Sequence, residues 1–189
     1  MVKSIPLLFF FALIGTLLAA QRELPSDFQA RLDQAGLSFI YPLDAGYKSR
    51  RNAPSPYFES HYTLRSRKEK MEIRYHIQPF DANDPTADLP HINASRLLLH
   101  LASNDGDKLM SGINLSEEVL QEDYQADWGK LFNFQPKSGF SRYQHCQMLA
   151  LFLEGKGMAY VLFLFDDAPP TLEYRKQALE FIDSEENLN

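Results

Sequence analysis

Two neighbouring stretches of the chain, residues 57–65 and 71–79, alternate between apolar and polar side chains. A period of two places successive side chains on opposite faces of a β-strand, so each stretch predicts a strand with one buried face. The polar stretch 66–70 joins them, and this arrangement favours an antiparallel hairpin.

The register of this hairpin follows from its hydrophobic positions. We align Leu64 with Ile73, because a shift by one residue would turn the apolar face of either strand toward water. The same register is expected to place Arg65 opposite Glu72 and His61 opposite His76.

Two later stretches, 146–154 and 158–165, are apolar at successive positions rather than at alternate ones. Apolar residues on both faces are typical of a strand that is covered from both sides. The stretch Gly155-Lys156-Gly157 between them predicts a tight turn. We therefore predict a second hairpin at the centre of the sheet.

The remaining segments predict helices and one short strand. Helical spacing or end signals indicate four helices, and an apolar run closed by a proline indicates the strand. The order of strands, helices, strands and a final helix predicts an α+β fold, an antiparallel sheet flanked by helices in an α/β/α sandwich. The helices are expected at 24–34, 90–103, 116–126 and 171–182, and the strand at 37–41, before a long loop at 43–56.

This order of elements resembles that of the exported PsbP-like and DcrB-like proteins. The matching features are the short strand ending in Pro42, the hairpin through Ile77, the helix after Pro90 and the closing strand–glycine–strand–helix. The resemblance covers most of residues 36–183 and departs in the acidic insertion 116–128. It implies an antiparallel sheet flanked by helices and an accessory or binding role without a catalytic site, and it carries over no functional residue.

The first twenty residues resemble a secretory signal peptide. Lys3 provides a positive charge, residues 5–18 form an apolar stretch too short for a membrane anchor, and Ala19-Ala20 suit cleavage. We predict a secreted or periplasmic protein that begins after Ala20, with no transmembrane segment in the mature form. Residues 21–189 are expected to form a single α+β domain with an ordered core at 36–183.

Charge is unevenly distributed along the chain. The net charge is −6, yet residues 22–76 carry more basic than acidic side chains. An acidic protein is poorly suited to nucleic acid, whose phosphates attract Lys and Arg, so we expect no nucleic-acid partner. The basic clusters at 48–51 and 65–70 are expected to be solvated loops, or else a surface for an anionic partner.

His61 and His76 form the most specific chemical hypothesis. Directly opposed residues on paired strands have Cβ atoms about 4.5–5.5 Å apart, close enough for two imidazoles to share Zn²⁺ or Cu²⁺. The competing interpretation is two polar residues on an outward face. Cys146, the single cysteine, is expected to be a buried thiol without a disulfide partner.

The sequence contains no nucleophile motif of a serine hydrolase, no phosphate-binding glycine-rich loop and no glycine fingerprint of a dinucleotide-binding fold. We therefore predict an exported, non-catalytic binding or accessory protein without a cofactor. A protein or small-ligand partner is expected to contact Arg67 and Lys68 of the hairpin turn, or exposed aromatics such as Tyr47, Tyr57 and, within 124–134, Trp128. The alternative is a metal-dependent enzyme or a metal-binding protein that uses His61 and His76.

Overall fold

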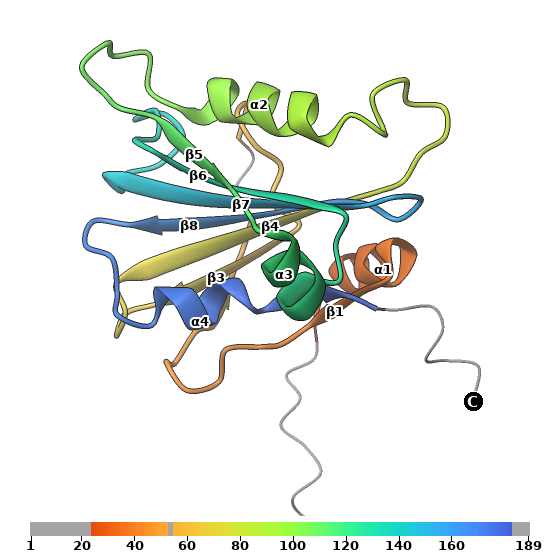
Figure 1. The fold of residues 1–189 in the computed structure, drawn as a ribbon. Coiled ribbons are helices and arrows are strands. Elements are labelled where there is room, and N and C mark those ends of the chain that lie inside the picture. The colour runs from red at the N-terminus through yellow and green to blue at the C-terminus, as the bar shows by residue number, and fades with distance from the viewer. Residues whose placement is uncertain (1–23, 53–54, 183–189) are drawn as a thin grey trace, which may run out of the picture.

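A seven-stranded antiparallel sheet forms the centre of the molecule, in the strand order β2-β3-β4-β8-β7-β6-β5 (Figure 1). The computed structural model describes residues 24–52 and 55–182, so the predicted signal peptide and its cleavage after Ala20 lie outside the described residues. The predicted α+β class with an antiparallel sheet is confirmed. The strands are β2 (Lys48–Arg50), β3 (Tyr62–Ser66), β4 (Met71–Pro79), β5 (Ser111–Asn114), β6 (Trp128–Phe134), β7 (His145–Leu153) and β8 (Gly157–Phe165).

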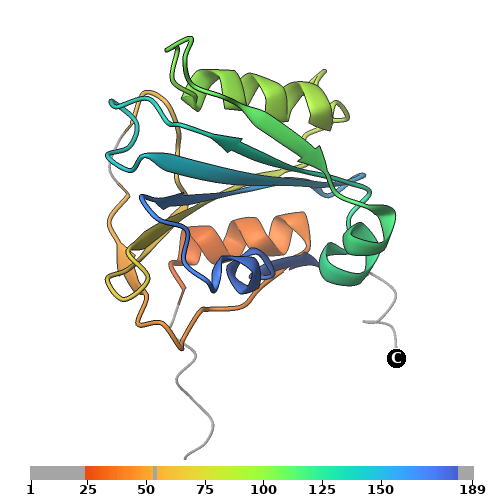
Figure 2. The same cartoon turned by 60° about the vertical axis from the view of Figure 1, so that its left-hand side comes forward.

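The two faces of this sheet are covered by different elements (Figures 1 and 2). α2 (Pro90–Leu101) packs on one face. None of the helices in the described part of the chain is long and apolar enough to cross a membrane. Several short elements and α1 cover the other face. They are α1 (Ser26–Ala35), α3 (Glu117–Val119), the π-helix η1 (Leu120–Tyr124), α4 (Leu172–Lys176) and a two-stranded sheet of β1 (Leu37–Phe39) and β9 (Leu179–Phe181).

Strand β8 explains why the fold needs two covering layers. All nine of its residues are buried. Val161 and Phe163 belong to the core under α1, whereas Tyr160 and Leu162 belong to the core under α2. The prediction that the 146–165 hairpin is covered on both sides is therefore confirmed.

The register of the first hairpin is also confirmed. Leu64 pairs with Ile73 and Arg65 with Glu72. The strand β3 begins at Tyr62, later than predicted. The segment before it does not continue the strand, because Phe58 packs against Phe140 on the α2 side of the sheet, with ring centroids 6.0 Å apart.

Three predictions of local structure are wrong. The closing helix ends at Lys176, and residues 179–181 form β9, which pairs with β1. The stretch 116–126 is divided into α3 and a π-helix, and Ser116 caps α3 by accepting a hydrogen bond from the Val119 N–H. The edge strands β2 and β5 lie in segments expected to be loops or left unassigned.

Candidate ligand-binding cleft

A cleft of about 630 Å³ lies beside α2, over the middle of the sheet. One wall is α2 and the opposite wall is the segment 57–59, which runs beside the sheet before β3 begins. The floor is formed by β4 and β8. The side chains that determine its chemistry are Arg96, Leu97 and His100 of α2, Tyr57 and Phe58 of the opposite wall, and His76, Gln78 and Tyr160 of the floor.

Helix α2 is held in place at both of its ends. Pro90 stands in its first turn, a position where proline lacks only a hydrogen-bond donor that would be unpaired in any case. Ala94 and Leu101 are fully buried against the sheet. Beyond the helix, Ala102 forms a bridge with Pro136, which fixes the C-terminal end of α2 to the segment that follows β6.

Lys137 closes one end of the cleft. Its Nζ donates a hydrogen bond to the carbonyl oxygen of His100 at 2.7 Å, where a cation suits the C-terminal end of a helix. The same Nζ lies 5.8 Å from the ring centre of Tyr57. Lys137 therefore contacts both walls of the cleft, α2 through His100 and the opposite wall through Tyr57.

Arg96 differs from Lys137 because its guanidinium has no hydrogen-bond partner within the described part of the chain. No described residue forms a hydrogen bond or an ion pair with its guanidinium. At the same end of the cleft, Asp84 accepts two hydrogen bonds from Thr86, which lower the pKa of that carboxyl, and the charge of Arg96 adds to the effect. Arg96 thus offers a cation with five donors to a bound ligand.

His61 and His76 lie side by side, as the hairpin register predicts. Their ring centres are 4.3 Å apart and the ring planes differ by 22°. Nδ1 of His61 accepts a hydrogen bond from the backbone N–H of Ile77 at 2.9 Å. Nδ1 of His76 donates to the carbonyl oxygen of Glu59 at 2.7 Å, which leaves Nε2 as an acceptor when this ring is neutral.

Burial keeps this pair uncharged near neutral pH. Removal from water lowers the pKa of His61 to about 3, and the neighbouring His76 and the charge of Arg31 act in the same direction. Burial also lowers the pKa of His76, partly offset by its hydrogen bond to Glu59. Two neutral rings can stack closely because neither repels the other.

We expect the free energy of unfolding to fall by about 1–2 kcal/mol between pH 7 and pH 5 because of His61. The unfolded chain binds a proton near pH 6.5, whereas folded His61 resists protonation down to about pH 3. Its stabilising effect is therefore complete above pH 6.5 and lost as the pH falls below that value. Urea unfolding of His61→Gln across this range should show a shallower dependence on pH.

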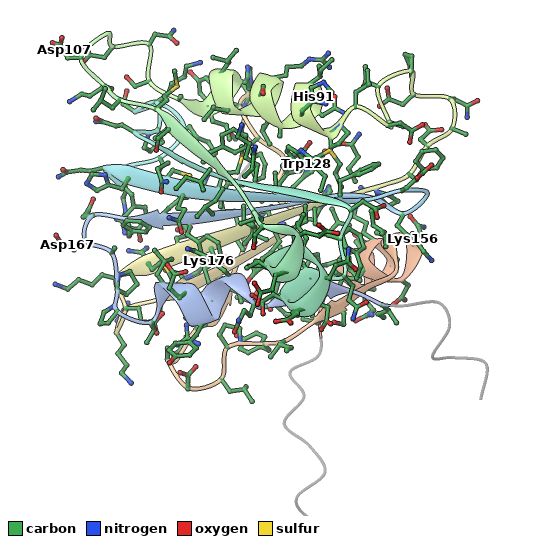
Figure 3. All side chains as sticks on the ribbon, viewed as in Figure 1. His91, Asp107, Trp128, Lys156, Asp167 and Lys176 are labelled. Carbon is green, nitrogen blue, oxygen red and sulfur yellow. The ribbon has the colours of Figure 1, made fainter. Side chains whose placement is uncertain are left out.

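The matched control for this experiment is His91→Gln. His91 is an exposed residue of α2 (Figure 3) and should leave the pH dependence unchanged. Equal slopes for the wild type and His61→Gln would show that His61 is not held neutral by burial.

The zinc or copper site at His61 and His76 stays a prediction. Both Nδ1 atoms already form hydrogen bonds, and a metal would have to lie in the plane of each ring, while these rings lie face to face. Among residues 24–52 and 55–182, no group of three or more His, Cys, Asp or Glu side chains is placed to hold a metal ion. The geometry therefore favours stacking over chelation.

The predicted partner-contact residues do not form one surface. Arg67 and Lys68 are exposed in the turn between β3 and β4. Trp128 is half-buried between α2 and the sheet (Figure 3). The strand pairings place Trp128 level with Phe152 at the opposite end of the sheet from that turn. The role of Arg67, Lys68 and Trp128 in binding a partner stays a prediction.

Three further residues named in the sequence predictions, two tyrosines and the single cysteine, are buried. Tyr47 and Tyr124 were expected to be exposed aromatics, but both are buried in the core under α1, because the loop and the π-helix that carry them fold back onto that layer. Cys146 is a buried free thiol, as predicted, and burial raises its pKa. The thiol is therefore unreactive in the folded protein.

The cleft itself was not predicted. The sequence predicts a helix at 90–103, but it does not show that Arg96 of this helix lies beside Tyr160 and segment 57–59. Comparisons of the chain with protein-family models, curated proteins and solved structures found no match.

Proposed function

We propose that this protein is an exported, non-catalytic binding module that holds a small amphipathic ligand in the cleft beside α2. The observation that carries the proposal is the cleft itself. Its volume of about 630 Å³ falls within the roughly 300–1,000 Å³ typical of small-molecule sites. The signal-like N-terminus and the resemblance to PsbP-like and DcrB-like proteins support export and an accessory role.

The lining suits a ligand with an apolar body and a polar group. Phe58, Leu97 and Tyr160 offer apolar and aromatic surface, and burial of such surface on a ligand contributes about 25 cal/mol per Å². Arg96 offers a guanidinium without a hydrogen-bond partner among the described residues at one end, and neutral His76 lines the floor. The expected ligand is therefore a small molecule with a ring or short chain and an acidic or hydrogen-bonding group.

A non-catalytic role agrees with the protonation states along the cleft. Acid–base catalysis requires a group that titrates near the working pH. Burial lowers the pKa of His76 and raises the pKa of Tyr160, so burial shifts the titration of both floor residues away from neutral pH. The metal-dependent enzyme remains the alternative, supported by the proximity of His61 and His76.

The probe for this proposal is 8-anilinonaphthalene-1-sulfonate, which joins an aromatic body to an acidic group. We expect one molecule to bind to the folded protein with a saturable rise in dye fluorescence. Leu99→Trp should weaken binding at least about tenfold, because Leu99 lines the cleft, is 62% exposed and can be enlarged without disturbing the core.

The matched control is Leu109→Trp. Leu109 is 91% exposed and does not line the cleft, so this variant should bind the dye as the wild type does. Circular dichroism must show that both variants are folded, since partly unfolded proteins also bind this dye. Equal binding by the two variants, or fluorescence that does not saturate, would contradict the proposal.

A further inference from the structure

A row of three polar side chains crosses strands β2, β3 and β4 at one edge of the sheet. Arg50 of β2 pairs with Thr63 of β3, and Thr63 pairs with Arg74 of β4. Directly paired residues point to the same face of a sheet, with Cβ atoms about 4.5–5.5 Å apart. Thr63 therefore lies between two arginines on the same face of the sheet.

This row lies in a second hollow, separate from the cleft. The hollow has a volume of about 330 Å³ and is lined by Arg50, Thr63 and Arg74 together with Arg51, Ser60 and Phe140. Phe58 lies between the hollow and the cleft and lines both. A ligand group of a few atoms can enter it without occupying the cleft.

Arg74 forms a rigid part of this hollow. Its Nε donates to Oε1 of Glu72 at 2.8 Å, and its guanidinium lies 4.7 Å from the ring centre of Phe140. Its Nη2 lies 2.7 Å from the same Oε1, and its Nη1 donates a longer hydrogen bond of 3.4 Å to the carbonyl oxygen of Phe140. The side chain is only 19% exposed, so its position is fixed before any ligand arrives.

Within residues 24–52 and 55–182, the arginines around the row outnumber the carboxylates. Within the described residues, Glu72 is the only carboxylate lining the hollow, and it forms an ion pair with Arg74. Arg50, Arg51 and Arg65 have no ion pair in that part of the chain. Lys48 even stands directly opposite Arg65, an arrangement of like charges that destabilises a sheet.

The hydroxyl of Thr63 gives a second indication of a ligand. Thr63 is 6% exposed, yet no described residue forms a hydrogen bond with its hydroxyl. This hydroxyl is therefore available to donate a hydrogen bond to an acceptor bound in the hollow.

We propose that Arg50, Thr63 and Arg74 bind a phosphate-type oxyanion, carried by a small soluble molecule. Guanidinium groups match the oxygen atoms of phosphate in geometry and charge, and the Thr63 hydroxyl donates a third hydrogen bond between them. The recessed hollow admits a phosphate group, whereas a flat membrane surface would meet only its rim. This site is independent of the ligand proposed for the cleft.

The test is a titration of the uniformly ¹⁵N-labelled protein with inorganic phosphate, followed by NMR. We expect saturable shifts at the amides of Arg50, Thr63 and Arg74. Arg50→Gln should weaken phosphate binding about tenfold, and Thr63→Val, which keeps the side-chain shape, at least about threefold.

The matched control is Arg67→Gln, which removes the same charge from an exposed turn outside the hollow. Its effect should be less than about twofold, since exposed charges at a distance are screened by salt. Equal weakening by Arg50→Gln and Arg67→Gln would overturn the proposal in favour of diffuse attraction. Tighter binding to phosphatidylglycerol vesicles than to inorganic phosphate would overturn it in favour of a membrane surface.

Discussion

Gly157→Ala is expected to lower the free energy of unfolding by about 3–5 kcal/mol, or to prevent folding altogether. Gly157, the first residue of β8, has a backbone φ of +115°, a conformation that residues with a side chain rarely adopt. An added Cβ would lie 2.2 Å from the carbonyl oxygen of Gln78 and 2.6 Å from the amide nitrogen of Phe80. Urea unfolding followed by circular dichroism and by the fluorescence of Trp128 measures the loss.

The close approach at Gly157 cannot be relieved locally. Both atoms that the Cβ would meet belong to the backbone, and Pro79, the last residue of β4, is paired with Gly157, the first residue of β8. The same contact holds Gln78 in the floor of the cleft. A folded Gly157→Ala protein should therefore also bind 8-anilinonaphthalene-1-sulfonate more weakly.

Gly155→Ala is the matched control, two residues earlier in the same turn. Gly155 also has a positive φ, of +69°, but no atom lies within 4 Å of its added Cβ. Only the cost of the backbone conformation remains, about 1 kcal/mol. Similar losses in the two variants would show that the contact with β4 does not constrain Gly157.

The parts of the fold that the sequence predicts well are those whose residues carry their own signal. The 146–165 hairpin is apolar at nearly every position, and such a strand requires cover on both faces wherever it lies. The hairpin register needed only the alternation through Leu64 and Ile73, because a slip would expose one whole face. The proximity of His61 and His76 followed from that register alone.

The elements that were missed depend on partners far away in the chain. β9 has three residues and extends only because β1, more than 130 residues earlier in the sequence, offers an edge to pair with. β5 is exposed at all four positions and so lacks the alternation that marks a half-buried strand. The cleft likewise depends on segments whose proximity no local pattern reveals. In the Arg50–Thr63–Arg74 row, the pairing of Thr63 with Arg74 follows from the hairpin register, whereas the pairing of Arg50 with Thr63 does not.

Arg175 of α4 is the centre of a polar cluster on the opposite side of the sheet from the cleft. Its guanidinium donates to both carboxylate oxygens of Asp44, at 2.8 and 2.9 Å, and to Oε1 of Glu69 at 2.6 Å. Glu69 also accepts hydrogen bonds from the hydroxyls of Tyr47 and Thr171. The cluster thereby joins α4 to the loop before β2 and to the turn between β3 and β4.

Replacement of Arg175 by methionine is expected to cost about 3–5 kcal/mol, because a buried carboxylate would lose its cation. The side chain of Glu69 is 7% exposed, whereas that of Asp44 is largely in solvent, so Glu69 bears most of the loss. Lys176→Met is the matched control on the same helix. Its partner Glu173 is 79% exposed, and breaking that pair should cost less than about 1 kcal/mol.

The pH dependence distinguishes loss of this charge pair from a general loss of packing. Burial alone would raise the pKa of Glu69, but the hydrogen bonds from Arg175, Tyr47 and Thr171 hold it below its usual value near 4.5. In the wild type, this carboxylate therefore stabilises the fold above pH 4.5 and loses that effect as the pH falls. Without Arg175, burial should raise the pKa of Glu69, so protonation relieves the unpaired charge and the deficit of Arg175→Met should shrink between pH 7 and pH 4. A deficit that stays constant over this range would mean that Arg175 acts through packing rather than through its charge.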